Sequence, residues 1–375
     1  MDRRELTGRL KGAARELGFS LAGACPAVTP AEGVARLGGW LAAGYAGEMA
    51  YLAGRNAAYA DPSRVLEGAR SILMLAMNYR TAAPAEASPG AGRVSRYAWG
   101  TDYHDVIHER LKGLMARLHE WAPEASSRGV VDTAPLLEKE FAQLAGLGWI
   151  GKNTLLLNRG QGSWFFLAAL LVDIELEYDA PTVTDHCGTC MACLEACPTG
   201  AFVAPYVLDS RRCISYLTIE LRGAIDPALR GQMGDWVFGC DVCQEVCPWN
   251  HRAPEANVDA FQPRDVVHPA RLREWFGWSD AEFRALFRDT PLWRARRRGL
   301  LRNAAIVLGN EHDGEALAAL RRGLNDDEPL VRGASAWALG QLGEAGRELL
   351  LERLAMEVDE QVRGEIEAAL GRSTV

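Results

Sequence analysis

Apolar residues recur at helical spacing in two stretches of the N-terminal half. Residues 6–17 place them three or four positions apart and are followed by Gly18, a common helix stop signal. Residues 104–121 show the same spacing. Because residues three and four apart share one helix face, each stretch is predicted to form an amphipathic helix.

Two continuous apolar runs predict strands that are buried on both faces. The runs are RSILMLAM at 70–77 and WFFLAALLV at 164–172. A shorter strand is expected at 19–23, and the composition of 82–92 is typical of a loop. This mixture of helices and strands predicts an α/β domain over residues 1–180.

The C-terminal part of the chain is repetitive. The tripeptide Val-Arg-Gly occurs at 331–333 and again 31 residues later at 362–364, each time before a helix rich in Ala and Leu. Leu-Arg-Asn at 301–303 begins a similar unit. The recurrence predicts HEAT-like helical repeats over 300–375, which usually form a binding surface. Residues 256–299 are a connector that contains three tryptophans.

Composition and charge place the chain among soluble globular proteins. It has 375 residues, of which 48% are hydrophobic and 24% charged, and this length predicts two or three domains. No apolar stretch approaches the length needed to cross a bilayer, and the first residues lack the apolar run of a secretion signal. We therefore expect a cytoplasmic protein without a membrane partner. Its net charge of −8 gives no general attraction to nucleic acid, so an RNA would have to meet a local basic surface.

Eight of the nine cysteines lie between residues 187 and 247. The first run is Cys187-x2-Cys190-x2-Cys193-x3-Cys197-Pro198, and the second is Cys240-x2-Cys243-x3-Cys247-Pro248 with Cys213 upstream. Both are typical of bacterial ferredoxins, in which the cysteine before proline binds the other cluster. The expected ligands of one [4Fe–4S] cluster are Cys187, Cys190, Cys193 and Cys247. Those of the second are Cys197, Cys213, Cys240 and Cys243, which predicts an inserted ferredoxin-like module over 181–255.

Three other interpretations of the cysteines compete with clusters. Structural zinc also uses paired cysteines, but rarely three at this spacing followed by Cys-Pro. Disulfides need an oxidising compartment, and buried inert thiols do not gather at such intervals. The ninth, Cys25, stands alone and is expected to be a small core residue.

Arginines are concentrated where the connector meets the repeats. Five fall within nine residues of a chain whose net charge is negative: Arg294, Arg296, Arg297, Arg298 and Arg302. One interpretation is a solvated helix face. The other is contact with the phosphates of a folded RNA, because guanidinium groups match phosphate geometry.

Six segments of the chain resemble the epoxyqueuosine reductase family. They are VDTAP at 131–135, AGLGWIGKN at 145–153, GSWFFL at 162–167, RYAWG at 96–100 with DYH at 102–104, RCISYLTIE at 212–220 and GCDVCQEVCPWN at 239–250. The ferredoxin motif occurs in many electron carriers, whereas the first two segments are much more specific. The resemblance extends over nearly the whole chain.

The resemblance implies a reaction, cofactors and a partner. The family removes the epoxide oxygen of epoxyqueuosine at the tRNA wobble position, the last step of queuosine synthesis, with cobalamin and two [4Fe–4S] clusters. It implies an α/β cobalamin-binding domain with an inserted two-cluster ferredoxin-like module and C-terminal HEAT-like repeats that help to hold tRNA. It also suggests a monomer, and the electron donor is not identified by the sequence.

Site residues follow from the same resemblance. Asp132 matches the proton donor of the family, and it must be protonated when the epoxide opens, a state that burial favours. The alternative is that Asp132 or Thr133 caps a helix over 136–144. The positions that match cobalamin contacts are Arg55, Asn153, Leu156, Leu167, Ser215, Asp241 and Val242, although Arg55 could be a surface ion pair and the leucines core residues. Tyr97, Tyr103 and His104 are candidates for lining the pocket.

Three other functions remain open from the sequence. A ferredoxin-type electron-transfer protein would have clusters but neither cobalamin nor tRNA affinity. A reductive dehalogenase-like enzyme on a small substrate would leave the repeats and the arginines without a role. A tRNA-binding module with structural clusters would bind RNA without needing a reductant.

Overall fold

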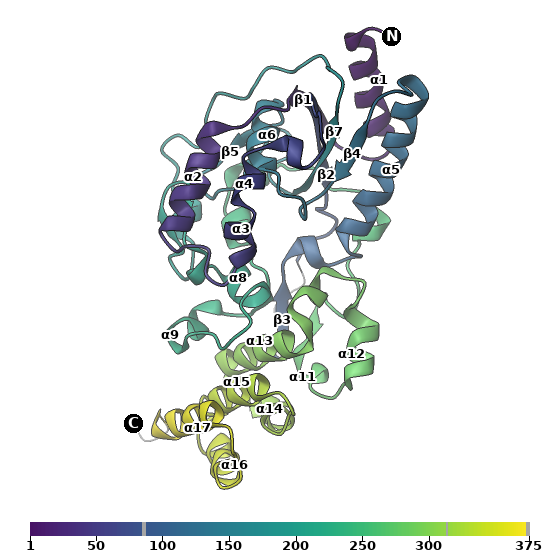
Figure 1. The fold of residues 1–375 in the computed structure, drawn as a ribbon. Coiled ribbons are helices and arrows are strands. Elements are labelled where there is room, and N and C mark those ends of the chain that lie inside the picture. The colour runs from purple at the N-terminus through teal and green to yellow at the C-terminus, as the bar shows by residue number, and fades with distance from the viewer. Residues whose placement is uncertain (85–87, 313, 373–375) are drawn as a thin grey trace. The chain divides into compact units, whose positions relative to one another are not determined.

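The computed structural model describes residues 1–84, 88–312 and 314–372, and it divides into two compact units (Figure 1). The first unit contains residues 1–81, 102–209 and 242–261, and the second contains 82–101, 210–241 and the chain from 262 onward. The units therefore cut across the predicted boundaries at 180 and 255. Residues 210–241 belong to the second unit because β10 (Trp236–Phe238) pairs with β3 (Ala91–Val94) and α8 (Ile214–Ile219) packs against α13 (Arg296–Glu311).

A four-stranded antiparallel sheet is the centre of the first unit. Its order is β1 (Leu21–Pro26), β2 (Ser71–Asn78), β7 (Phe165–Val172) and β4 (Ser127–Val130). The predicted strands at 70–77 and 164–172 are confirmed, and β2 is buried along its whole length. The predicted strand at 19–23 begins two residues later, at Leu21.

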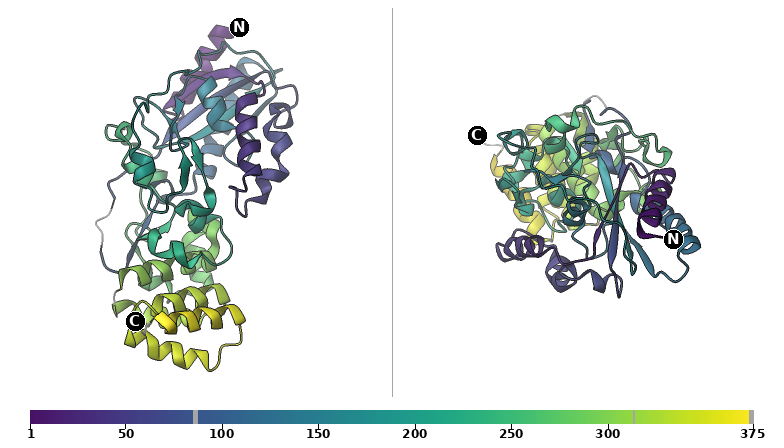
Figure 2. Two further views of the ribbon diagram at one scale, coloured as in Figure 1. Left: turned by 90° about the vertical axis from the view of Figure 1, so that its left-hand side faces the viewer. Right: turned by 90° about the horizontal axis from the view of Figure 1, so that it is seen from above.

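Helices cover both faces of this sheet. On one face α1 (Arg3–Glu16) and α5 (Tyr103–Trp121) pack together, and both contact strands (Figure 2). On the other face α6 (Glu138–Leu144) packs against alternate residues of β2, namely Ile72, Met74 and Ala76. Cys25 lies in this core and is fully buried, as expected of a structural thiol. Both predicted amphipathic helices are therefore confirmed, because each has a sheet face on which to bury its apolar side.

The remaining elements of the first unit are short. The helices are α2 (Ala31–Ala42), α3 (Ala50–Gly54), α4 (Asn56–Tyr59), α7 (Ala192–Glu195) and α10 (Val242–Glu245). The strands form two small antiparallel pairs, β5 (Trp149–Ile150) with β6 (Leu156–Leu157) and β8 (Phe202–Ala204) with β9 (Val207–Leu208). Six of the eight clustered cysteines lie here: Cys193 is on α7 and Cys243 on α10, while Cys187, Cys190, Cys197 and Cys247 lie in the loops beside them.

The second unit joins a small sheet to helical repeats. The sheet has the order β10, β3 and β11 (Ala270–Arg271), so β3 occupies the last residues of the stretch predicted as a loop, of which 85–87 lie outside the described residues. The helices are α8, α9 (Pro227–Arg230), α11 (Leu272–Trp275), α12 (Asp280–Phe287), α13 (Arg296–Glu311), α14 (Leu317–Leu324), α15 (Pro329–Leu339), α16 (Glu344–Leu354) and α17 (Glu360–Arg372). Along the array α13 packs on α15 and α15 on α17, which confirms the predicted helical repeats (Figure 2, left).

The recurring tripeptides place one arginine at the same point of each repeat. Arg302 donates to the carbonyls of Leu217, Leu221 and Gly223. Arg332 pairs with Glu357 and also donates to the carbonyls of residues 326 and 327. Arg363 donates to the carbonyls of residues 354 and 357. These repeat arginines therefore satisfy backbone acceptors that would otherwise be left without hydrogen bonds.

Among the residues that the structure describes, no helix combines the length and the apolar character needed to cross a bilayer.

Candidate functional site

Asp132 lies in a turn that directly follows β4 and has a backbone φ of +54°. This left-handed conformation is uncommon for residues other than glycine, and surrounding contacts must hold it. The backbone N–H of Asp132 donates to Glu138 Oε1 at 2.8 Å, and Arg55 Nη1 donates to the carbonyl of Thr133 at 3.1 Å. The alternative capping role is wrong, because α6 begins only at Glu138 and its N-cap, Leu137, makes no side-chain cap bond.

Two side chains from the start of α5 contact the Asp132 carboxylate. The hydroxyl of Tyr103 donates to Oδ2 at 2.6 Å, and His104 Nε2 lies 3.4 Å from the same oxygen. The other ring nitrogen of His104 lies 2.7 Å from Asp102 Oδ1. Asp102 is the N-cap of α5, so the helix start itself holds Tyr103 and His104 in place.

The ring of Tyr103 is fixed between two neighbours. It stacks on Phe166 of β7 at 4.2 Å and on His104 at 4.1 Å between ring centroids. Because both neighbours lie on regular elements, the hydroxyl is held against Asp132 before any substrate arrives. Such preorganisation is typical of groups that act in proton transfer.

The charges around Asp132 are coupled. Burial lowers the pKa of His104, but its bonds with Asp102 and Asp132 outweigh burial and raise the pKa to about 9. Burial, followed by the nearby charge of Asp132, raises the pKa of Glu138 to about 8. At neutral pH the histidine is therefore a cation and Glu138 a neutral acid. The Asp132 side chain is about 60% exposed, so the chain alone does not supply the burial that the sequence analysis expected.

Four cysteines line a cavity of about 250 Å³ in the first unit. They are Cys187, Cys190, Cys193 and Cys247, the set expected for one cluster, and Lys152, Leu157, His186 and Trp249 complete much of the wall. The volume is several times the ~30 Å³ share of one water molecule in the liquid, so it exceeds what a single metal ion needs. Four thiols around a cavity of this size fit a cubane cluster.

The expected second set is divided between the units. Cys197 and Cys243 belong to the first unit, and Cys213 and Cys240 belong to the second. Within the first unit, Cys197 Sγ accepts from the backbone N–H of Ala201 at 3.3 Å. The assignment of these four residues to one cluster stays a prediction.

Comparisons with known proteins match the chain from end to end. Family models match at 60–133 ("Epoxyqueuosine reductase QueG, DUF1730"), at 186–250 ("4Fe-4S double cluster binding domain") and at 293–371 ("HEAT repeats"). Epoxyqueuosine reductase of Pseudomonas aeruginosa is 46% identical over 351 residues, which cover 92% of this chain and 96% of that protein. The Escherichia coli enzyme is 40% identical over 356 residues, with 94% and 93% covered. The chain belongs to the epoxyqueuosine reductase family.

Solved structures of the epoxyqueuosine reductase family share this fold. One is a crystal structure of epoxyqueuosine reductase with an epoxyqueuosine-modified tRNA-Tyr stem loop, at a TM-score of 0.92 and 32% identity, with 99% of both chains covered. The enzyme of Streptococcus thermophilus gives a TM-score of 0.87 at 27% identity, with 98% of this chain and 99% of that chain covered. The resemblance stated from the sequence is therefore confirmed, as are the double-cluster domain and the repeats.

The residues predicted to contact cobalamin are found in both units, and this assignment stays a prediction. In the first unit Arg55 is exposed beside the Asp132 turn, and Asn153 is buried, with its amide 3.4 Å from the carbonyl of Cys243. Leu156 is buried, Leu167 is half-buried against the same core, and Val242 begins α10. In the second unit Ser215 is half-buried on α8. Asp241 is buried there, and its carboxylate accepts from Ser95 Oγ and from the backbone N–H of Arg96.

The arginines predicted to meet tRNA fall into three groups. Arg302 is only 1% exposed and is one of the repeat arginines, so its prediction as a phosphate contact is corrected by its burial. Arg294 pairs with Glu220, and Arg297 pairs with Asp326. Arg296 and Arg298 are exposed, and the Arg296 guanidinium lies 4.8 Å from the centroid of the Trp293 ring.

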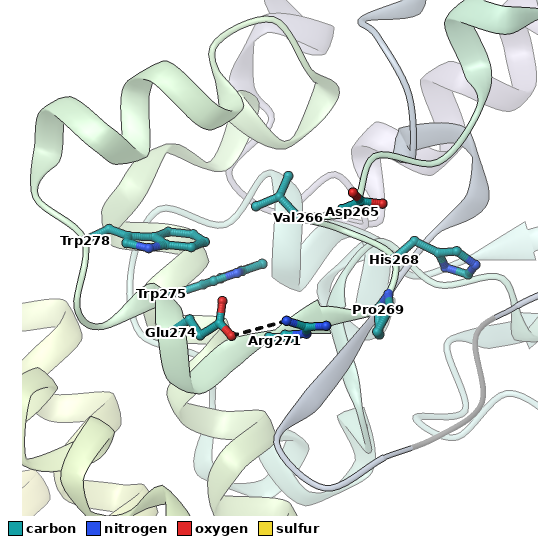
Figure 3. Close-up of a pocket in the computed structure, with 8 residues that line it drawn as sticks. All are labelled: Asp265, Val266, His268, Pro269, Arg271, Glu274, Trp275 and Trp278. Atoms are coloured by element: carbon teal, nitrogen blue, oxygen red, sulfur yellow. Dashed lines mark ion pairs between the residues drawn. The ribbon is translucent and has the colours of Figure 1, made fainter.

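A second cavity, of about 390 Å³, lies in the second unit where the connector folds (Figure 3). Its walls include Trp275 and Trp278, and the ion pair between Arg271 and Glu274 lies along one side. The two tryptophans also pack with Phe283 and Phe287 of α12. Two of the three connector tryptophans thus belong to a local aromatic core that supports α11 and α12.

Two residues of the site were not singled out from the sequence. Glu138 holds the Asp132 backbone, and Lys152 donates from Nζ to the carbonyls of Gly188 and Cys190. Both lie inside or just after segments that carry the family resemblance, but an acid at a helix start and a lysine in a loop are ordinary in any sequence. Their roles come from partners that only the fold brings near.

Proposed function

We propose that this chain is an epoxyqueuosine reductase, which removes the epoxide oxygen of epoxyqueuosine at the wobble position of tRNA to give queuosine. The observation that carries the proposal is the Asp132 turn, in which a carboxylate meets a phenol and an imidazolium within a family whose curated members bear this name. The related structure that contains an epoxyqueuosine-modified stem loop supports tRNA as the substrate.

The reaction consumes two electrons and two protons and releases water. Opening the epoxide breaks one carbon–oxygen bond and leaves an alkoxide, which must receive a proton. Asp132 is the proposed donor of this proton, and Tyr103 and His104 face its other carboxyl oxygen, Oδ2. Loss of the oxygen as water then forms the alkene and consumes the second proton. General acid catalysis of this kind contributes about 10²–10⁴-fold to rate.

Tyr103 and His104 are proposed to stabilise the carboxylate that Asp132 becomes once it has given up its proton. The imidazolium of His104 lies 3.4 Å from the carboxylate and is charged at neutral pH, because its pKa is raised to about 9. The Tyr103 hydroxyl stabilises the carboxylate by donating to it. The pair can therefore stabilise a negative Asp132 after it has given its proton, and the next proton comes from solvent, which reaches the exposed carboxylate.

Cobalamin and the clusters supply the redox chemistry, and the residues of the chain supply position. When bound, cobalamin provides a strong nucleophile for the epoxide carbon. We propose Arg55, Asn153, Leu156, Leu167, Ser215, Asp241 and Val242 as its contacts. Arg55 and Asp132 are both exposed in the first unit, which leaves room for a cofactor and a substrate beside the carboxylate. Two [4Fe–4S] clusters, each held by four of the eight cysteines between residues 187 and 247, would deliver the electrons one at a time.

Binding of tRNA is proposed for the repeat region. The exposed Arg296 and Arg298 are the strongest candidates for phosphate contacts, with Arg294 and Arg297 available only if their ion pairs open. We further propose a monomer that works in the cytoplasm and takes electrons from a separate donor protein. Size-exclusion chromatography of the reconstituted protein tests the oligomeric state, and elution at the mass of one chain is the expected result.

The decisive experiment is a deoxygenation assay. The protein is purified anaerobically, its clusters are reconstituted, and it is incubated with cobalamin, a low-potential reductant and an epoxyqueuosine-containing anticodon stem loop. The RNA is then digested, and the mass of the modified nucleoside is measured by mass spectrometry. Loss of one oxygen that requires both cobalamin and reductant is the expected result. An unchanged nucleoside, with clusters intact and cobalamin bound, would reject this substrate.

A further inference from the structure

The indole of Trp149 lies buried against cysteines of the first cluster site. Trp149 is 2% exposed and packs in one cluster with Cys247, Leu157 and Cys187. Its ring meets Trp249 edge to face at 5.1 Å and His186 at 4.8 Å. Strand pairing with Leu157 fixes its backbone, because Gly148 brings the two strands so close that a Cβ there would lie 2.0 Å from the Leu157 carbonyl oxygen. The ring therefore has one orientation.

The N–H of this indole has no oxygen or nitrogen partner among the described residues. It is buried without a hydrogen-bond partner, within the side-chain cluster that contains Cys247 and against which Cys187 packs. A buried donor without an acceptor costs free energy, so a site that keeps one commonly serves a bound group. A thiolate of Cys187 in a cluster is an acceptor of the required kind, with more negative charge than a thiol.

A positive charge lies in the same loop. Lys152 is 9% exposed, and its Nζ donates to the carbonyls of Gly188 and Cys190 at 2.6 and 3.0 Å. The lysine therefore ties the segment that carries Cys187 and Cys190 and lines the same cavity. A buried ammonium is screened less by water than a surface charge.

We propose that the indole N–H of Trp149 and the ammonium of Lys152 raise the reduction potential of the first cluster. Reduction adds one electron, and therefore one negative charge, to the cluster and its sulfur atoms without changing any bond. A donor next to the cysteines and a cation at the carbonyls of Gly188 and Cys190 stabilise the reduced state more than the oxidised state. Both residues thus position charge for electron transfer and take no part in the epoxide chemistry. The inference rests on the proposed assignment of Cys187, Cys190, Cys193 and Cys247 to one cluster.

The test compares two tryptophan variants of the reconstituted full chain. Trp149→Phe keeps an aromatic ring and removes the N–H. Trp249→Phe is the matched control, because its indole N–H faces the carbonyl of His186, at 3.4 Å, and not a cysteine. The reduced clusters are followed by electron paramagnetic resonance during an anaerobic redox titration, and iron content reports the loading. Trp149→Phe is expected to lower one of the two cluster potentials, so that the ratio of reduced to oxidised cluster falls by up to about tenfold, or about 59 mV for one electron.

Lys152→Met provides the second variant and should move the same potential in the same direction. Fully loaded protein whose Trp149→Phe potentials equal those of the wild type would overturn the role of Trp149. An equal fall in Trp149→Phe and Trp249→Phe would also overturn it, because loss of packing would then explain the change. Wild-type protein that takes up less iron than two clusters require would instead reject the cluster assignment, and this inference with it.

Discussion

At the scale of single residues, Asp132 combines an uncommon backbone conformation with three side-chain neighbours. Its φ of +54° is held through Glu138, while Tyr103 and His104 face its carboxylate. The position of the acid thus depends on residues 28 and 29 positions before it and on one six positions after it. From the sequence, the family resemblance could point to Asp132, but spacing alone could not predict these contacts, because they form only when α5, β4 and α6 pack together.

Asp132→Asn is expected to lower turnover by at least about 100-fold, because the amide cannot donate a proton as an acid does. Asparagine tolerates the left-handed conformation, so the turn should keep its shape. Single-turnover deoxygenation of the stem loop measures the effect, and iron content and cobalamin binding should remain normal. The matched control is Glu138→Gln, which keeps an oxygen acceptor for the Asp132 N–H. Near-normal turnover in Asp132→Asn would show that Asp132 is not the proton donor.

His104 makes stability depend on pH. Its pKa of about 9 in the folded chain lies above its ordinary value of 6.5, so the folded state holds the proton more tightly than the unfolded state. The stabilisation is therefore complete below pH 6.5 and is lost as pH rises through about 9. The unfolding temperature of the wild type should exceed that of His104→Gln by more at low pH than at high pH. A gap that widens as pH rises would contradict the charged pairing with Asp102 and Asp132.

At the scale of elements, the apolar runs were sufficient to predict the central strands and the long helices. β7 is fully apolar, and β2 is apolar from Ile72 to Met77, because helices cover both faces of the sheet. The helices α1 and α5 show helical spacing because each has one buried side. The antiparallel order β1-β2-β7-β4 was not predictable, since pairing joins strands that lie far apart in sequence. The sequence showed that an arginine recurs in each repeat unit, but it did not show that this arginine is buried between helices. Arg302, the arginine of the first unit, was therefore predicted to contact RNA.

Arg332→Met should destabilise the repeat array by about 3 kcal/mol, because it removes the main partner of a buried carboxylate. The Glu357 side chain is fully buried, and burial alone would raise its pKa, but Arg332 and its other donors lower that pKa to about 2. Arg347→Met is the matched control, since Arg347 donates to a single carbonyl, that of Leu370. Thermal or urea unfolding monitored by helix content compares the two. Equal losses of unfolding free energy in both variants would show that the ion pair between Arg332 and Glu357 adds no stability beyond that of an ordinary arginine hydrogen bond.

At the scale of the whole molecule, an acidic chain must bind a polyanion through a small basic area. The net charge is −8, and two of the predicted arginines, Arg294 and Arg297, are already paired with carboxylates. Binding should then depend on few phosphate contacts and should discriminate strongly against RNA that lacks the right shape. The division of the chain into two units was not predictable from composition. The chain leaves the first unit after residue 209, contributes 210–241 to the second unit and returns at 242, and no linker-like sequence marks either crossing.

Arg296→Gln and Arg298→Gln are expected to weaken stem-loop binding and to reduce the salt dependence of affinity by about one released counterion each. Fluorescence anisotropy at several salt concentrations measures both quantities. Arg294→Gln should have a smaller effect, because its guanidinium must first leave Glu220. A salt dependence unchanged in the double variant Arg296→Gln/Arg298→Gln would place the RNA elsewhere on the chain.

The repeat arginines also limit how the chain can be shortened. Arg332 takes its carboxylate partner from the turn after α16, whereas Arg302 takes its carbonyl partners from residues 217–223, far upstream. A deletion that ends the chain before α16 would therefore remove Glu357 and also uncover the buried side of α15, on which α16 and α17 pack. A trimmed enzyme, whether arising by evolution or made in the laboratory, should stay soluble only if the uncovered apolar residues of α15 are replaced by polar ones, as in a terminal capping repeat.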